Sequence, residues 1–153
     1  MKISETRDCE ILSVLSQGVQ ELHVQLYPDY FKEYDYNVVK EFFESMVNNP
    51  NFIFLLLEDE SRYFGYAMIE IKRYQENPFK KAYQSLYIHQ FSIVDSYRKK
   101  GYGSKIMEKI EEIANAKKIR KLELDYWCAN TIAKEFYRKC GFITCREFVY
   151  KII

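Results

Sequence analysis

Apolar residues recur at the three-to-four-residue spacing of amphipathic helices in four segments of the chain. The predicted helices are residues 8–27, 37–47, 104–118 and 130–140. We expect Asn37 to cap the second helix, because a short polar side chain there can accept a backbone N–H. Pro28 is expected to end the first helix and Gly141 the fourth.

Shorter runs rich in β-branched and aromatic residues predict six strands. They are residues 2–7, 52–57, 63–71, 83–94, 122–127 and 142–153. The polar residues 58–61 join the second and third runs and predict a hairpin, whereas residues 27–36 have no clear period and predict a loop or broken helix. This order predicts a single α/β domain over residues 1–153, with one mixed sheet, helices on both faces and a ligand beside the strand ends.

The charge balance narrows the class of partner. The 23 Lys and Arg nearly cancel the 22 Asp and Glu, whereas proteins that bind nucleic acid or membrane surfaces need a broad basic excess. We therefore expect a small-molecule partner, no nucleic acid and no membrane. The four cysteines form no C-x-x-C pair and there are only two histidines, so we expect reduced thiols and no metal site. No apolar run approaches the ~20 residues that span a bilayer, and we expect a cytoplasmic protein.

The loop RKKGYGS at residues 98–104 is a candidate anion site. Gly101 and Gly103 let the backbone turn tightly and approach a bound group, because neither carries a Cβ. At the start of a helix, consecutive N–H groups and the positive end of the dipole favour a phosphate, and the neighbouring Arg and Lys side chains add positive charge. The alternative is an ordinary solvated basic turn.

Two sequence motifs at a defined spacing decide between these alternatives. The segment FSIVDSYRKKGYG at residues 91–103 resembles the strand and (Q/R)-x-x-G-x-(G/A) loop of the GCN5-related N-acetyltransferase (GNAT) superfamily. The segment NTIAKEFYRKCGF at residues 130–142 is similar to that family's N-x-x-A-x-x-F-Y-x-x-x-G-F helix. The resemblance implies a mostly antiparallel mixed sheet of six to seven strands flanked by about four helices.

The resemblance also implies acetyl-coenzyme A as co-substrate. Its pantetheine arm would pair with the backbone of Ile93 and Val94, its pyrophosphate would lie on the amides of residues 100–104, and Asn130 would hydrogen-bond the arm. The implied cofactor residues are Ile93, Val94, Arg98, Lys99, Lys100, Gly101, Tyr102, Gly103, Ser104 and Asn130. Tyr137 would point its hydroxyl at the sulfur, where a phenol can supply a proton to the departing thiolate.

A neutral amine must form before attack, so a side chain or an ordered water has to accept a proton. Tyr87 and His89 occupy positions that resemble the paired histidines of arylalkylamine acetyltransferases, and an imidazole suits a base at neutral pH. Strand alternation predicts that both share a face with Phe91 and Ile93. The alternative for His89 is a structural histidine satisfied by a backbone carbonyl. The strand carboxylates Glu70, Glu123 and Asp125 are weaker candidates for proton relay or amine binding.

The segment 27–36 is the best candidate for the acceptor side, because aromatic faces beside carboxylates attract cations. We expect Tyr27, Asp29, Tyr30 and Tyr87 to face the acceptor, although such tyrosines can also simply supply buried area. The leading hypothesis is acetyl transfer to a small primary amine by direct attack. A peptide or protein acceptor and a non-catalytic acyl-coenzyme A sensing domain remain alternatives, and strand-like final residues are compatible with a homodimer.

Overall fold

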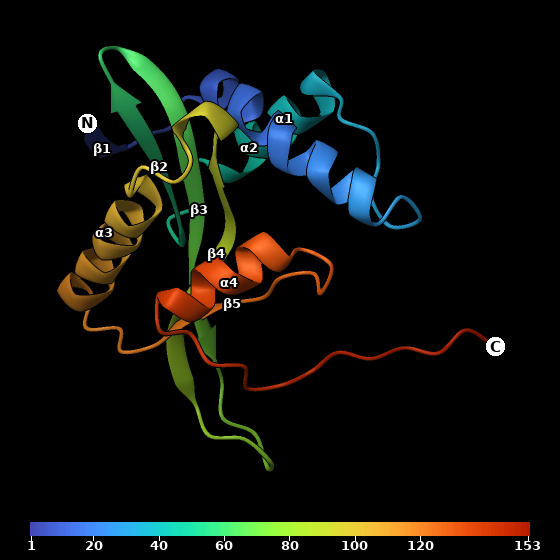
Figure 1. Ribbon diagram of the computed structural model, residues 1–153. Coiled ribbons are helices and arrows are strands. Elements are labelled where there is room, and N and C mark those ends of the chain that lie inside the picture. Colours follow the sequence, from blue (N-terminus) through green and yellow to red (C-terminus); the bar gives the residue numbers. More distant parts are fainter.

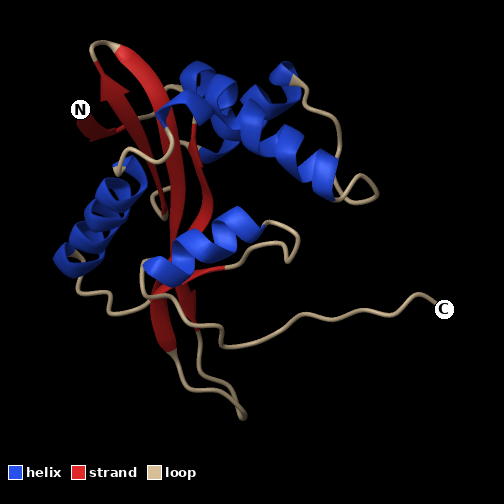
Figure 2. Ribbon diagram, in the orientation of Figure 1, coloured by secondary structure: helices blue, strands red, loops and turns tan.

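The computed structural model describes all residues 1–153, and a single sheet forms its centre (Figures 1 and 2). The strands follow one another in chain order across the sheet and are β1 (Lys2–Glu5), β2 (Phe52–Asp59), β3 (Arg62–Tyr74), β4 (Tyr83–Ile93) and β5 (Leu122–Leu124). The first four strands pair antiparallel, and β5 pairs parallel with β4. The expected mixed sheet is confirmed, but the expected six to seven strands is wrong, because the sheet has five.

Four helices cover the sheet on both faces, as the sequence predicts. They are α1 (Cys9–Leu26), α2 (Tyr36–Met46), α3 (Tyr102–Ala116) and α4 (Thr131–Lys139), with a short 3-10 turn, η1 (Asp95–Tyr97), after β4. None of these helices combines the length and the apolar character that crossing a membrane requires.

The core divides into two layers because side chains alternate along each strand. Phe54 and Leu56 of β2 pack with Tyr66 of β3 under α1 and α2. The intervening Leu55 and Leu57 face the other way, into a larger cluster built with the apolar stripe of α3. The sheet is therefore the middle of three layers. The C-terminal end of β4, which has no partner strand on its outer side, lies between the two pairs of helices.

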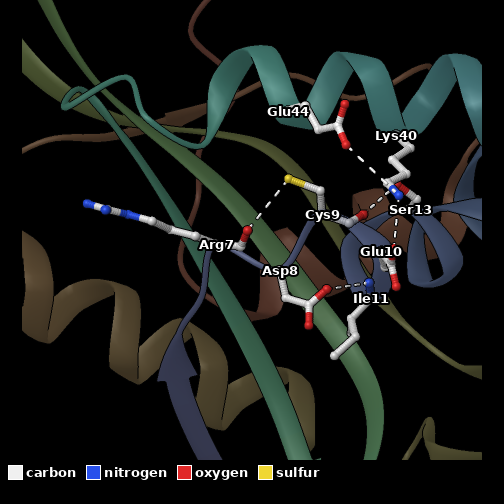
Figure 3. Close-up of polar contacts among 8 residues, drawn as sticks. All are labelled: Arg7, Asp8, Cys9, Glu10, Ile11, Ser13, Lys40 and Glu44. Carbon is white, nitrogen blue, oxygen red and sulfur yellow. Dashed lines mark hydrogen bonds and ion pairs between the residues drawn. The ribbon is translucent and has the colours of Figure 1, made fainter.

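Side-chain bonds fix the start of α1 and its contact with α2 (Figure 3). The Asp8 carboxylate accepts the backbone N–H of Ile11 at 3.0 Å, which satisfies one of the unpaired donors of the first turn. Lys40 of α2 lies 2.9 Å from the Glu10 carboxylate and 4.0 Å from that of Glu44. The ion pair between Lys40 and Glu10 is the one of these contacts that joins the two helices.

Three local expectations need correction. Asp35, not Asn37, caps α2, because its carboxylate accepts the N–H groups of Asn37 and Val38 at 2.9 and 3.2 Å. The fifth strand ends at Leu124 instead of residue 127. Residues 142–153, predicted as a strand, form no regular secondary structure, because no neighbouring strand pairs with them.

Candidate active site

The strand β4 extends beyond the end of its neighbour β5, and this leaves part of the β4 edge without a partner strand. The two strands pair only at three positions, from Leu86 and Leu122 to Ile88 and Leu124. Beyond Ile88, β4 continues to residue 93 with β3 as its only partner, while the chain after β5 turns away towards α4 (Figure 1). Residues 89–93 therefore border a splayed gap in the sheet.

The backbone groups on that open edge can be assigned from the bonds around them. The N–H of Val94 donates to Phe64 at 2.8 Å and its carbonyl accepts the N–H of Tyr97 at 2.9 Å. Of the backbone groups of Val94, only the second lone pair of this carbonyl is left for the expected pairing with a ligand. Peptide groups alternate in direction along a strand, and the N–H and C=O of Ile93 consequently face the gap. This carbonyl accepts the guanidinium Nε of Arg98 at 2.9 Å.

His89 is the extra residue of a β-bulge. Gln90 pairs with Met68 and Ile88 pairs with Ile69, so the register between β3 and β4 shifts by one residue at His89. A bulge changes which face the following side chains occupy.

The bulge overturns the expected common face. Tyr87 and His89 lie on the α1 and α2 side, where the His89 ring stacks on Phe52 at a centroid distance of 5.6 Å. Phe91 and Ile93 instead pack into the cluster beneath α3. Simple alternation failed here because it does not count the inserted residue.

The basic loop turns through two left-handed residues into the start of α3. Lys99 and Gly101 adopt left-handed conformations with φ of 60° and 82°, and Gly101 caps α3 without a side-chain bond. The N–H groups of residues 102–104 open the helix and so have no acceptor within it. Arg98 is tied back to Asp95 by a 2.9 Å ion pair. The positive side chains in and beside the loop are Arg98, Lys99, Lys100 and Lys105.

Gly103 brings the loop against α4. A Cβ at this position would lie 2.8 Å from Cε2 of Phe136, closer than such atoms pack. The Phe136 ring also contacts Phe91 on the open part of β4, at a centroid distance of 5.4 Å. One aromatic ring therefore joins the loop, the open strand and the second motif.

The second motif supplies Asn130 and Tyr137. Asn130 caps α4, and its carbonyl oxygen accepts the N–H of Ala133 at 3.1 Å, which leaves its amide NH₂ as the side chain's donor. Tyr137 is 8% exposed and packs between the rings of Tyr126 and Phe142 at 6.2 and 5.6 Å. Burial raises the pKa of Tyr137 well above that of an ordinary phenol, so its hydroxyl keeps its proton at neutral pH.

His89 lies in a polar cluster on the other face. Its Nε2 is 2.6 Å from a carboxylate oxygen of Glu70, which also lies 3.8 Å from the ammonium of Lys72. The hydroxyl of Tyr87 donates to Asp125 at 2.6 Å, and Lys72 sits 3.5 Å from the centre of the Tyr87 ring. Burial, and then the bond to Asp125, raise the pKa of Tyr87.

The expected acceptor-side aromatics meet the segment that follows β5. Tyr27, Tyr30 and Phe31 surround Trp127 at centroid distances of 4.6, 5.4 and 5.0 Å. The Tyr27 hydroxyl accepts the backbone N–H of Ala129 at 2.9 Å. We call Tyr27, Tyr30, Phe31 and Trp127 the aromatic cluster; it bridges the α1–α2 connection and the β5–α4 connection.

A cavity of about 190 Å³ opens between α1, α2 and the bulge. It is lined mainly by apolar side chains and by Gln90, whose amide oxygen accepts the hydroxyl of Tyr66 at 2.8 Å. The cavity ends beside the open stretch of β4.

The predicted site residues thus form three groups. In the first group, Phe136 contacts both the loop and Tyr137. The second group is the polar cluster, which contains His89 and Tyr87. The third is the aromatic cluster, which contains Tyr27 and Tyr30, while Asp29 is exposed outside it. Sequence reasoning missed Lys72 and Trp127. Trp127 carried a signal, as the single tryptophan of the chain, whereas nothing in the sequence distinguished Lys72 from other strand lysines.

A family model, described as the acetyltransferase (GNAT) family, matches residues 16–142. The uncharacterized N-acetyltransferase YycN of Bacillus subtilis (strain 168) is 32% identical over 59 residues, which are 39% of this chain and 38% of that protein. A mutant of the BH1408 protein from Bacillus halodurans has 25% sequence identity and a TM-score of 0.91, covering 100% of this chain and 99% of its own.

The aminoglycoside N-acetyltransferase AAC(6′)-Iy, solved in complex with CoA, is 14% identical, with a TM-score of 0.72 and coverage of 99% of this chain and 93% of its own. At that identity the likeness is one of fold.

Proposed function

We propose that this chain, which belongs to the acetyltransferase (GNAT) family, moves the acetyl group of acetyl-coenzyme A to a primary amine of a small molecule by direct attack in a ternary complex. One observation carries the proposal: the open edge of β4 leads into the basic loop at the start of α3, and Phe136, the residue before Tyr137, contacts both.

The residues of the gap fit coenzyme A. The acceptor-free N–H groups of residues 102–104 and the cations around them suit its pyrophosphate. The open edge at Ile93 suits the amides of the pantetheine arm, and the free NH₂ of Asn130 can donate to that arm. When bound, the thioester supplies an activated acetyl group and a thiolate leaving group.

Tyr137 is proposed to stabilise that thiolate. An ordinary thiol has a pKa of about 8.5 and a phenol about 10, and burial raises the pKa of Tyr137 further. Full transfer of the phenolic proton to sulfur is therefore uphill. A buried hydroxyl that keeps its proton instead donates a hydrogen bond to the developing negative charge, which is a preorganised form of stabilisation.

His89 is proposed as the base, oriented by Glu70. If Nε2–H donates across the 2.6 Å contact to Glu70, the other ring nitrogen is left as an acceptor for a proton of the amine. Glu70 also supports the imidazolium that results, because opposite charges stabilise each other. The carboxylate that orients His89 therefore comes from the neighbouring strand β3.

The acceptor is proposed to approach between the polar cluster and the aromatic cluster. Tyr87, Tyr27 and Tyr30 offer aromatic faces, and Asp125 and Asp29 offer carboxylates, a combination that favours cationic amines. A small amine fits this surface better than a folded protein tail, because the aromatic cluster ties the two flanking connections together across the gap.

A thiol-release assay with acetyl-coenzyme A and a panel of polyamines, aminoglycosides, arylalkylamines and peptides tests the proposal. We expect release that depends on at least one small amine. Release with peptides alone would favour a protein acceptor. Tight cofactor binding by calorimetry with no release on any amine would overturn catalysis and favour a sensing domain.

A further inference from the structure

Lys72 is a cation of the polar cluster for which the proposed mechanism gives no role. It lies in β3 opposite Ser85 of β4, two residues along the strand from Glu70, which pairs with Tyr87. The side chain of Lys72 is only 28% exposed. Covering a long charged side chain costs conformational freedom and hydration, and specific contacts have to offset that cost.

Two kinds of group hold the Lys72 ammonium. Its Nζ lies 3.5 Å from the centre of the Tyr87 ring, over the aromatic face. It also lies 3.8 Å from Oε2 of Glu70, the same carboxylate oxygen that Nε2 of His89 contacts at 2.6 Å. The Tyr87 ring is itself fixed, because its hydroxyl donates to Asp125 at 2.6 Å. An aromatic face beside carboxylates is a position for an amine cation, and here a lysine of the chain fills it.

The charges of this cluster are already balanced. Glu70 and Asp125 supply two negative charges, and Lys72 supplies one positive charge. The pKa of Tyr87 is raised by burial and then by Asp125, whereas Arg146 acts on this pKa in the opposite direction, which places a second cation near the ring. The two carboxylates therefore face two cations before any acceptor arrives.

We propose that Lys72 is a specificity-determining residue, whose ammonium occupies the cation position of the polar cluster and excludes acceptors with a second positive charge close to the reacting amine. Monoamines are then favoured as acceptors, and short diamines and polyamines are disfavoured. The acceptor meets the aromatic cluster and not the Tyr87 face that Lys72 covers. This inference rests on the proposed function, because it takes His89 as the base beside the reacting amine.

Lys72 is close enough to the base for its charge to act on the acceptor. Nζ of Lys72 and Nε2 of His89 both contact Oε2 of Glu70, so a single carboxylate oxygen separates the ammonium from the imidazole. A second ammonium three carbons from the reacting nitrogen stays near Lys72. Even at the dielectric constant of water, the repulsion of two unit charges 4 Å apart is equivalent to about a fivefold change in an equilibrium constant.

Two isosteric acceptors measure this selection. In 1,3-diaminopropane a terminal ammonium replaces the methyl group of butylamine, and the ratio of their kcat/KM values is compared between proteins so that the intrinsic reactivity of each amine cancels. We expect Lys72→Met to raise the ratio of diamine to monoamine at least about fivefold. Lys72→Arg should leave it unchanged, because a guanidinium keeps the charge over the ring. Lys81→Met is the matched control, since Lys81 is an exposed lysine in the connection between β3 and β4, and it should also leave the ratio unchanged.

A binding measurement tests the role of Lys72 without turnover. Tetramethylammonium cannot be acetylated, and such quaternary cations bind to aromatic faces. In calorimetric titrations with tetramethylammonium chloride, we expect Lys72→Met to gain a binding site that the unchanged protein and Lys81→Met lack. The double variant Lys72→Met, Tyr87→Leu should lose that site again, because the aromatic face is gone.

Failure of this inference differs from failure of the proposed function. If no amine gives thiol release with the unchanged protein or any variant, the proposed function fails, and the tetramethylammonium titration alone decides whether Lys72 fills a cation position. An unchanged ratio of diamine to monoamine in Lys72→Met, or no gain of tetramethylammonium binding, would overturn the inference. A ratio that rises as much in Lys72→Arg as in Lys72→Met would assign the selection to side-chain shape and would overturn it as well.

Discussion

Replacing Gly103 with alanine separates two explanations of the G-x-G loop. As part of a phosphate cradle, Gly103 is needed so that the backbone can approach a ligand. In the structure it is also the point where α3 meets α4, because a Cβ would lie 2.8 Å from Cε2 and 3.1 Å from Cζ of Phe136. The Phe136 ring is confined on two further sides, since it also contacts Phe91 at 5.4 Å and Tyr137 at 5.3 Å.

The size of the effect follows from a comparison of two glycines. Gly18 lies inside α1 with nothing within 4 Å of a Cβ, so Gly18→Ala should stabilise the fold by about 0.5–1 kcal/mol. Gly103→Ala adds overpacking, which typically costs about 1–3 kcal/mol. We expect the two variants to differ in free energy of unfolding by at least that 1–3 kcal/mol, or by about 2–12 °C in Tm for a chain of this length.

Urea and thermal unfolding of both variants measure this difference, and calorimetry with acetyl-coenzyme A measures the cradle. The double variant Gly103→Ala, Phe136→Leu should recover stability, because a smaller side chain makes room for the added methyl, and the two sites should show coupling in a double-mutant cycle. Equal stabilities of Gly18→Ala and Gly103→Ala would refute the tight contact with Phe136. If Gly103→Ala lost affinity for acetyl-coenzyme A while its free energy of unfolding stayed unchanged, Gly103 would be needed for the phosphate cradle alone.

Three further predictions concern the base, a helix cap and the buried tyrosines. His89→Gln should lower the rate at neutral pH, with partial recovery at high pH, where more of the amine is already neutral. An unaltered pH–rate profile would exclude His89 as the base. Asp35→Ala should cost about 1 kcal/mol by urea unfolding and Asn37→Ala much less, and the reverse order would restore Asn37 as the cap. Burial raises the pKa of Tyr66 and of Tyr137 above the unfolded value of about 10. Their contribution to stability is therefore complete below pH ~10 and declines above it. Urea unfolding midpoints that stay constant from pH 9 to 11 would contradict this decline.

The layers and most of the elements could be predicted because each follows from a local pattern. Alternating and helical periods identified the hairpin β2–β3 and the stripe of α3, and the two motifs coincide with the loop that opens α3 and with α4. Local pattern could not find the bulge at His89, since an extra residue leaves no mark in composition. For that reason Phe91 and His89 were predicted to lie on the same face of the sheet.

The remaining differences depend on partners distant in sequence. Asp35 and Asn37 are both good capping residues, and only the path of the chain from α1 decides between them. Residues 142–153 have the composition of a strand, but a strand also needs a neighbour to pair with, and none of the five strands pairs with them. Trp127 and Lys72 joined these clusters only through folding, which brings residues 27–31 to Trp127 and Tyr87 to Lys72.

The most direct test of the central claim is amine-dependent thiol release from acetyl-coenzyme A by Tyr137→Phe, measured beside Tyr126→Phe and the unchanged protein. Tyr126 is a neighbouring tyrosine whose ring lies 6.2 Å from that of Tyr137, so its variant controls for the loss of a hydroxyl nearby. We expect Tyr137→Phe to lose about 10²-fold or more in kcat, the typical effect of removing one such donor, with unchanged affinity for acetyl-coenzyme A, while Tyr126→Phe keeps its rate. Equal turnover in all three proteins would contradict the role of Tyr137 at the sulfur.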